Sequence, residues 1–225
     1  MRIAEIFHSI QGEGQFAGTP SVFVRTTGCN LRCWFCDTDY TSWHPQGHIQ
    51  SYQDVLQQAC AFDCEHVVVT GGEPLLQPQV VPLTQALADR GHFLTIETAG
   101  TVYRPVYADL VSLSPKLANS TPAAGRWSDR HEKIRANRDV VERLIGNYKF
   151  QLKFVIDCRE DVVEVDEYLE GYAGVPAENV WLMPQATTNA ELQAKSSWIA
   201  TEAEQRGYRF SPRLHIEMFG NARGV

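Results

Sequence analysis

The sequence has no long hydrophobic runs. No apolar stretch in its 225 residues approaches the roughly 18 residues that a membrane-spanning helix requires. The start of the chain, MRIAEIFHSIQGEGQ, also lacks the apolar segment of a secretory signal peptide. We therefore expect a cytoplasmic protein that works away from the membrane.

An excess of positive charge is missing as well. The 20 Lys and Arg residues are outnumbered by 27 Asp and Glu residues, which gives a formal net charge of −7. Such a chain has no overall attraction to nucleic acid or to anionic lipid, and we expect neither as a partner. Hydrophobic residues make up 44% of the composition, and the length suits a single domain over residues 1–225 with a substantial core.

Internal repeats and low-complexity tracts are absent, and strand and helix signals alternate instead. Runs of β-branched residues predict strands at 21–26, 66–70, 94–98, 110–114, 150–156 and 180–184, with a last strand near Leu214. Amphipathic segments predict helices at 51–60, 80–90, 139–145, 162–169 and 190–205. This alternation favours an α/β fold with a mainly parallel sheet of about six or seven strands. That number is too small for a closed eight-stranded barrel, so we expect a partial, open TIM-like barrel.

Six cysteines in a chain without a secretion signal favour metal ligands or free thiols over disulfides. Three of them, Cys29, Cys33 and Cys36, have the spacing C-x3-C-x2-C. Three thiolates on one loop can hold three irons of a [4Fe-4S] cluster and leave the fourth iron open. The alternative is zinc, with a fourth ligand from Cys60, Cys64, His44 or His48.

The zinc alternative lacks the second C-x2-C pair that is typical of such sites. Cys60 and Cys64 lie at the end of a predicted helix, where a packing role is the simpler interpretation. Cys158 stands alone, and we expect it to be inert.

The three-cysteine motif resembles the signature of the radical S-adenosylmethionine (SAM) superfamily. The predicted α/β fold and the aromatic Phe35 before the last cysteine add to this resemblance. The resemblance implies a partial barrel in which the open iron binds SAM. It also implies that the reduced cluster cleaves SAM to a 5′-deoxyadenosyl radical, so no protein residue need act as the catalyst.

Further motifs follow predicted strands and resemble the SAM-binding elements of that superfamily. The glycines of TGGEP, residues 70–74, let the backbone approach a ligand closely. Lys116 offers a positive charge suited to a carboxylate, and Lys153 lies in an apolar strand, where it needs a partner or a cavity. The predicted SAM contacts are Phe35, Cys36, Asp37, Gly72, Glu73, Glu97, Ser114, Pro115, Lys116, Lys153, Met183, Pro184 and Gln185.

The order of motifs carries a narrower resemblance. SIQGEG (9–14), Arg25, CDT (36–38), TGGEP, IETAG (96–100), SPK (114–116) and GNARG (220–224) resemble the 7-carboxy-7-deazaguanine synthase family of queuosine biosynthesis. The resemblance implies a lyase that converts 6-carboxy-5,6,7,8-tetrahydropterin to 7-carboxy-7-deazaguanine with loss of ammonia. It also implies a homodimer that regenerates SAM.

The chemistry of a carboxypterin explains the residues that this resemblance assigns to the substrate. Glu13 can accept hydrogen bonds from the guanidine-like edge, and Arg25 can bind the carboxylate. The Thr38 hydroxyl would hold a Mg²⁺ ion that bridges to the same carboxylate. The predicted substrate contacts are Ile10, Gln11, Gly12, Glu13, Arg25 and Thr70.

The chain departs from the family pattern at two places. Ala99 stands in IETAG where the family often has Asn, and the chain ends in GNARGV where some relatives end in proline. We therefore transfer no contact to the C-terminus and treat His215 and Arg223 only as candidate contacts.

Residues 117–138 show no clear period and predict a polar insertion. Its segment RWSDRHEKIRANR carries four arginines and a lysine against Asp129 and Glu132. One interpretation is a solvated charged loop, and the other is a docking patch for an acidic electron donor such as flavodoxin, since the cluster must be reduced.

Two rival functions stay open from the sequence. Another radical SAM enzyme, such as a glycyl-radical activase, would share the cysteine motif but consume SAM. A zinc-stabilised binding module without catalysis would use the same cysteines as structural ligands.

Overall fold

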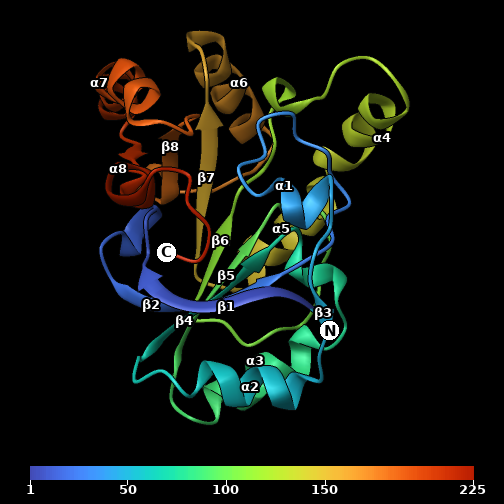
Figure 1. Ribbon diagram of the computed structural model, residues 1–225. Helices are drawn as coiled ribbons and strands as arrows, with labels where there is room; N and C mark the ends of the chain where they lie inside the picture. Colours follow the sequence, from blue (N-terminus) through green and yellow to red (C-terminus); the bar gives the residue numbers. More distant parts are fainter.

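One nine-stranded sheet organises the computed structural model, which describes residues 1–225 (Figure 1). Its strand order is β3-β1-β2-β4-β5-β6-β7-β8-β9. The strands are β1 Arg2–Ile10, β2 Pro20–Thr26, β3 His48–Ile49, β4 His66–Gly71, β5 Phe93–Thr98, β6 Leu110–Leu113, β7 Phe150–Ile156, β8 Val180–Pro184 and β9 Arg209–Phe210. Pairing is parallel from β2 through β9, whereas β1 runs antiparallel to β2 and β3. The edge strands β3 and β9 do not pair with each other, so the barrel is open, as predicted.

Most of the helices lie between parallel strands in the sequence and pack against the outside of the sheet, whereas the last helix follows the final strand (Figure 1). The helices are α1 Asp39–Ser42, α2 Tyr52–Ala59, α3 Val80–Ala88, α4 Arg126–Arg135, α5 Arg138–Asn147, α6 Arg159–Glu170, α7 Asn189–Gln205 and α8 Leu214–Phe219. The predicted entry into α2 is confirmed, because the Ser51 hydroxyl accepts from the Asp54 N–H and the Asp54 carboxylate accepts from the Ser51 N–H. None of the helices combines the length and apolar character that crossing a bilayer would take.

Hydrophobic burial explains the parallel strands. His66 to Thr70 in β4 are all buried, as expected for a strand covered on both faces. A cluster of 31 buried residues joins the strands to α2, α3, α5, α6 and α7. The sequence predicted β7 and β8 with their observed bounds, because both are short apolar runs.

Three local predictions need correction. Residues 117–138 contain a full helix, α4, because Trp127, His131 and Ile134 form a sparse inward-facing row among charged residues. The strand expected near Leu214 is wrong: that segment is α8, and the last strand is the two-residue β9. Strand β1 was not predicted, because it is only partly buried and its polar residues blur the alternation.

Helix α4 is attached to the cysteine loop through His131, whose side chain is buried. The backbone N–H of Arg32 donates to His131 Nδ1 over 3.1 Å, so Nδ1 carries no proton. The other ring nitrogen, Nε2, lies 2.8 Å from the Ser120 hydroxyl, which itself donates to the Leu117 carbonyl. The network fixes a neutral imidazole, and burial lowers the pKa of His131 to about 4.

Acidification should therefore destabilise the protein through His131. The unfolded chain takes up a proton near the ordinary pKa of 6.5, whereas the folded chain resists it until about pH 4. The stabilisation is complete above pH 6.5 and is lost as the pH falls toward 4, by at most about 3 kcal/mol. We expect the unfolding free energy, measured by chemical unfolding between pH 4 and 7, to fall less on acidification for His131→Asn than for wild type.

The exposed His44 supplies the control, because His44→Asn leaves the buried His131 network intact and should keep the loss of stability that this network causes on acidification. Burial also lowers the pKa values of His66 and His215. Part of the slope of unfolding free energy against pH should therefore remain in His131→Asn. An identical slope in His131→Asn and wild type would contradict the role of His131.

Candidate active site

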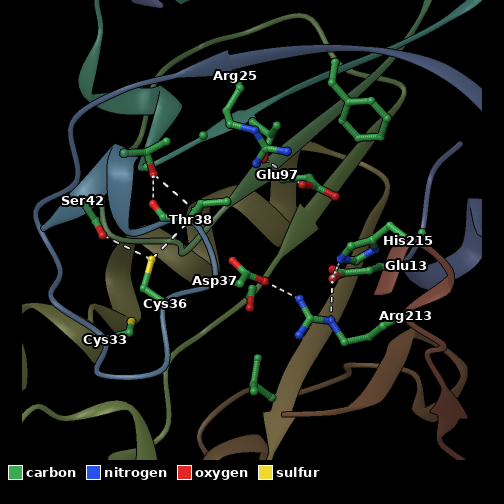
Figure 2. Close-up of a pocket in the computed structure, with 18 of the residues that line it drawn as sticks. Glu13, Arg25, Cys33, Cys36, Asp37, Thr38, Ser42, Glu97, Arg213 and His215 are labelled. Atoms are coloured by element: carbon green, nitrogen blue, oxygen red, sulfur yellow. Dashed lines mark hydrogen bonds and ion pairs between the residues drawn. The ribbon is translucent and has the colours of Figure 1, made fainter. Parts of the chain in front are cut away.

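A cavity of about 270 Å³ opens inside the partial barrel (Figure 2). The cysteine loop after β2 forms one part of its wall, and the loop after β1 forms another. The lining includes most residues predicted for cluster, SAM, metal and substrate. These are Ile10, Gln11, Gly12, Glu13, Arg25, Cys29, Cys33, Phe35, Cys36, Asp37, Thr38, Thr70, Gly72, Glu97, Ser114, Lys116, Lys153, Met183 and Gln185.

The three clustered cysteines are free thiols that line this cavity. Burial raises the pKa of Cys29 to about 12 and that of Cys33 to about 11, and it raises the pKa of Cys36 as well. Such thiols ionise when a metal takes the place of the proton. Three unpaired thiols on one loop, facing a cavity with room for a further ligand, fit a [4Fe-4S] cluster with one open iron.

The other cysteines lie outside the cavity lining. Cys60 contacts His92 Nε2 at 3.5 Å, and Cys64 donates to the Pro20 and His66 carbonyls. Both cysteines are partly buried and pack against the hydrophobic core, in keeping with the sequence interpretation. The one trio of His, Cys, Asp and Glu ligand atoms within 4.8 Å of one another is Glu13, Asp37 and His215, which contains no thiol.

Gly72 and Glu73 of the TGGEP turn have different surroundings. Gly72 lines the cavity, and a side chain there would collide with the Gly28 carbonyl. Glu73 is fully buried and outside the cavity lining. Its carboxylate accepts from the Thr98 hydroxyl and from the backbone N–H groups of Leu75 and Ala99. Glu73 therefore joins the turns after β4 and β5, and Gly72 presents its backbone to the cavity.

The other predicted SAM residues at the carboxyl ends of β6 and β8 also include some that line the cavity and some that do not. Ser114 and Lys116 line the cavity and bond to each other, with Lys116 Nζ 2.6 Å from Ser114 Oγ, whereas Pro115 is outside the lining. Met183 and Gln185 line it on either side of Pro184, which does not. The Gln185 amide oxygen accepts from Lys195 on α7, and this bond fixes its orientation.

Glu13 reaches the cavity by a route that the sequence did not predict. Because β1 is antiparallel to β2, with Ile10 opposite Pro20, the loop after β1 starts at the amino ends of the parallel strands. From there Glu13 extends to Lys153 in the middle of β7 and bonds to its ammonium. Lys153 is 4% exposed and lies 3.8 Å from Glu97, so the buried lysine has the partners that it needs.

Arg213 is the main site residue that sequence reasoning missed. Its guanidinium lies between two carboxylates, donating to Glu13 over 3.1 Å and to Asp37, and it also bonds to the Ala186 carbonyl (Figure 2). Burial opposes ionisation of Glu13, but Lys153 and Arg213 outweigh it and hold the pKa of Glu13 far below its ordinary value. Glu13 is therefore an acceptor at any physiological pH. No motif marked Arg213, and its only signal was a charged residue beside the candidate His215.

Arg25 shares a carboxylate with the C-terminal segment. Its Nε lies 2.8 Å from Glu5 Oε1, and the Tyr40 hydroxyl donates to the same oxygen over 2.7 Å. Arg223 reaches the other oxygen of Glu5 at 3.4 Å and stacks on the Tyr40 ring at 4.1 Å. Residues 221–225 line the cavity, so the tail that the sequence left without a role covers part of the site.

Glu97 bridges two further predicted substrate residues, Gln11 and Thr70. The Gln11 amide donates to Glu97 Oε1 over 3.2 Å, and the Thr70 hydroxyl donates to Glu97 Oε2 over 2.8 Å. Glu97 was predicted as a SAM contact, yet it bonds to two predicted substrate residues and lies near Lys153. Glu97 therefore lies between the predicted SAM contacts and the predicted substrate contacts.

Comparison with known proteins agrees with this geometry. Residues 23–149, more than half of the chain, match the model of the radical SAM superfamily, and the open barrel with its cysteine loop is of that class. Among solved structures, QueE from Escherichia coli superposes with a TM-score of 0.71 at 25% identity, covering 93% of this chain and 92% of that one.

Curated relatives define the family more closely. A 7-carboxy-7-deazaguanine synthase of Halobacterium salinarum is 45% identical over 98% of this chain and 91% of its own length. One from Rhodopirellula baltica is also 45% identical, over 99% of this chain and 88% of its own length. The chain belongs to the 7-carboxy-7-deazaguanine synthase family.

Proposed function

We propose that this protein converts 6-carboxy-5,6,7,8-tetrahydropterin to 7-carboxy-7-deazaguanine with loss of ammonia, as a radical SAM lyase of queuosine biosynthesis. The observation that carries the proposal is one cavity lined by the three-cysteine loop, the Gly72 turn and the Glu13 loop. Membership of the family agrees with it. The cofactors are a [4Fe-4S] cluster, SAM and Mg²⁺, and residues 1–225 would form a single radical SAM domain.

Cys29, Cys33 and Cys36 would hold the cluster, which when bound supplies the electron for cleavage of SAM to a 5′-deoxyadenosyl radical. Five residues that line the same cavity offer groups suited to SAM: backbone at Gly72, a hydroxyl at Ser114, an ammonium at Lys116, a thioether at Met183 and an amide at Gln185. Lys116 would bind the methionyl carboxylate, and Gly72 lets the backbone approach the amino group.

Glu13 would bind the pterin edge. One of its oxygens bonds to Lys153 and the other to Arg213, yet a carboxylate has about four acceptor positions, so two stay available. Arg25 offers its terminal nitrogens to the substrate carboxylate, because Glu5 faces its Nε. A substrate lacking either group would leave acceptor positions of Glu13 or terminal N–H donors of Arg25 without a hydrogen-bond partner, which accounts for selectivity.

The proposal is tested by anaerobic turnover with the carboxypterin, a reductant and SAM. We expect 7-carboxy-7-deazaguanine to form while the total SAM stays constant. SAM consumed in proportion to turnover, without deazaguanine, would indicate another radical SAM reaction. Colourless protein that holds zinc in place of iron would indicate the non-catalytic module.

Thr38 is the residue that we propose for Mg²⁺. Its hydroxyl lies in the cavity wall, 3.8 Å from Cys36 Sγ and 3.5 Å from the Thr41 hydroxyl, which also bonds to the Thr38 carbonyl. These contacts fix a hard oxygen ligand beside the cluster loop. Mg²⁺ keeps several waters and needs few protein ligands, so one hydroxyl suffices once the substrate carboxylate completes the shell.

Replacing Thr38 with Ala should weaken the response of turnover to Mg²⁺ by at least about tenfold in apparent affinity. Titration of chelator-treated enzyme with MgCl₂ measures the effect. Thr38→Ser retains the hydroxyl and should respond like wild type. An equal Mg²⁺ response in Thr38→Ala would place the metal at other residues.

We also propose that the enzyme works as a homodimer and takes its electron from a small acidic protein such as flavodoxin. Support for the donor comes from the surface beside the cysteine loop. Trp34, next to Cys33, is 54% exposed, and the guanidinium groups of Arg32, Arg126 and Arg130 all lie over the Trp127 ring. A cationic surface near the cluster, on a chain of net charge −7, would attract an acidic partner.

Reversing two of these charges, Arg126→Glu with Arg130→Glu, should lower flavodoxin-driven turnover about tenfold or more at low salt, because steering depends on charge. Dithionite-driven turnover should stay at the wild-type rate. Arg90→Glu changes the same charge type at the exposed end of α3 and should leave both rates unchanged. Equal loss with both reductants would mean that the patch serves folding, not docking.

A further inference from the structure

One of the three cluster cysteines has a hydroxyl neighbour. Ser42, the last residue of α1, places its Oγ 3.2 Å from Cys36 Sγ (Figure 2). Ser42 is 3% exposed, and the structure gives its hydroxyl no other hydrogen-bond partner. Cys29 differs, because its sulfur accepts only from the Leu31 backbone N–H, at 3.4 Å. The Thr38 hydroxyl lies farther from Cys36 Sγ, at 3.8 Å, so the buried Ser42 hydroxyl is the nearest potential donor to this sulfur.

The position of Ser42 is fixed by its neighbours on both sides. The Thr41 carbonyl accepts from the Gly28 N–H over 2.8 Å, which ties α1 to the start of the cysteine loop. The Trp43 indole N–H donates to the Cys33 carbonyl over 2.9 Å, which ties α1 to the middle of that loop. The hydroxyl between them is thus held against Cys36 by one backbone and one side-chain hydrogen bond, neither of which involves a sulfur.

The direction of the bond follows from the chemistry of the sulfur. In the free protein either atom can donate, but a cysteine that ligates iron is a thiolate and can only accept. With the cluster bound, the Ser42 O–H must be the donor. Hydrogen bonds to the sulfurs of an iron–sulfur cluster stabilise its more negative, reduced state and raise its reduction potential.

We infer that Ser42 is a positioning residue that sets the reduction potential of the cluster by donating a hydrogen bond to the Cys36 thiolate. Reduction adds one electron from the donor protein or from dithionite to the cluster, and the hydrogen bond offsets part of the added negative charge. The inference rests on the proposed ligation of the cluster by Cys36. It gives a role to a side chain that neither binds substrate nor ligates metal.

The test is a potentiometric titration of the reconstituted, SAM-free enzyme, followed by electron paramagnetic resonance of the reduced cluster. Ser42→Ala should keep the iron content of wild type and shift the midpoint potential to a more negative value. Ser42→Cys, whose S–H is a weaker donor, should shift it less. Trp43→Phe removes one of the two bonds that position α1 but keeps the Gly28–Thr41 bond and the Ser42 donor, so its midpoint should shift less than that of Ser42→Ala.

Several results would overturn the inference. They are an unshifted midpoint in Ser42→Ala, an equal shift in Trp43→Phe, or loss of iron from both Ser42 variants, which would make the residue structural. Failure of the proposed function looks different: wild type would then show no reduced-cluster signal, or Cys36→Ala would keep a full complement of iron.

Discussion

Alanine at Cys29, Cys33 or Cys36 should abolish cleavage of SAM, because each of the three thiolates would hold one iron of the cluster. The expectation follows from the geometry of the loop, where no other thiol lines the cavity and can replace a lost ligand. Two ligands hold a cluster weakly, and the protein should purify with little iron. Anaerobic assay of 5′-deoxyadenosine formation, together with iron analysis, measures both effects.

Cys60→Ala is the matched control. Cys60 is a partly buried cysteine that contacts His92 at 3.5 Å and packs against the core, so its loss costs stability but should leave iron content and SAM cleavage unchanged. A fully active Cys33→Ala protein would remove the radical SAM assignment, and inactive Cys60→Ala protein with low iron would bring the zinc-type ligand set back into consideration.

The cysteine motif shows what a sequence can reveal. Cys29, Cys33 and Cys36 lie within eight residues, so their spacing alone restricts them to one loop, and the glycines of TGGEP mark a turn in the same local way. The apolar runs of β4, β7 and β8 likewise carry their structure in adjacent residues.

Other parts of the site depend on pairings that no local pattern encodes. Lys153 and Glu13 are 140 residues apart, and Arg213 bonds to Asp37 across 176 residues. The sequence indicated that Lys153 needed a partner but could not say which carboxylate would reach it. It also treated Glu73 as a ligand contact, although a carboxylate after two glycines can equally face inward, as this one does toward Thr98.

The buried charges around Glu13 form a chain across the cavity. Arg213 links Glu13 to Asp37, which follows the proposed cluster ligand Cys36, and Lys153 links Glu13 to Glu97. Every charged member has an opposite charge within 4 Å, which is the condition for keeping such groups buried. The network therefore fixes the loop after β1 relative to the cysteine loop.

Removal of the charge at Glu13 should consequently weaken substrate binding while the cluster survives. Glu13→Gln retains the shape of the side chain but places an amide N–H₂ against Lys153, Arg213 or the donor edge of the pterin, none of which can accept from it. We expect the affinity for the carboxypterin to fall by about 1–3 kcal/mol, roughly 5- to 150-fold, because donors that were paired with a carboxylate lose an acceptor.

Calorimetric titration of the SAM-loaded enzyme with the carboxypterin measures that loss, and iron content with SAM affinity should match wild type. The same substitution at Glu142, whose carboxylate forms an exposed pair with Arg138 on α5, should change neither binding nor stability appreciably. Normal carboxypterin affinity in Glu13→Gln would show that the pterin edge binds elsewhere. In that case Glu13, Lys153 and Arg213 would form a structural ion network, and its loss would appear in the unfolding free energy instead.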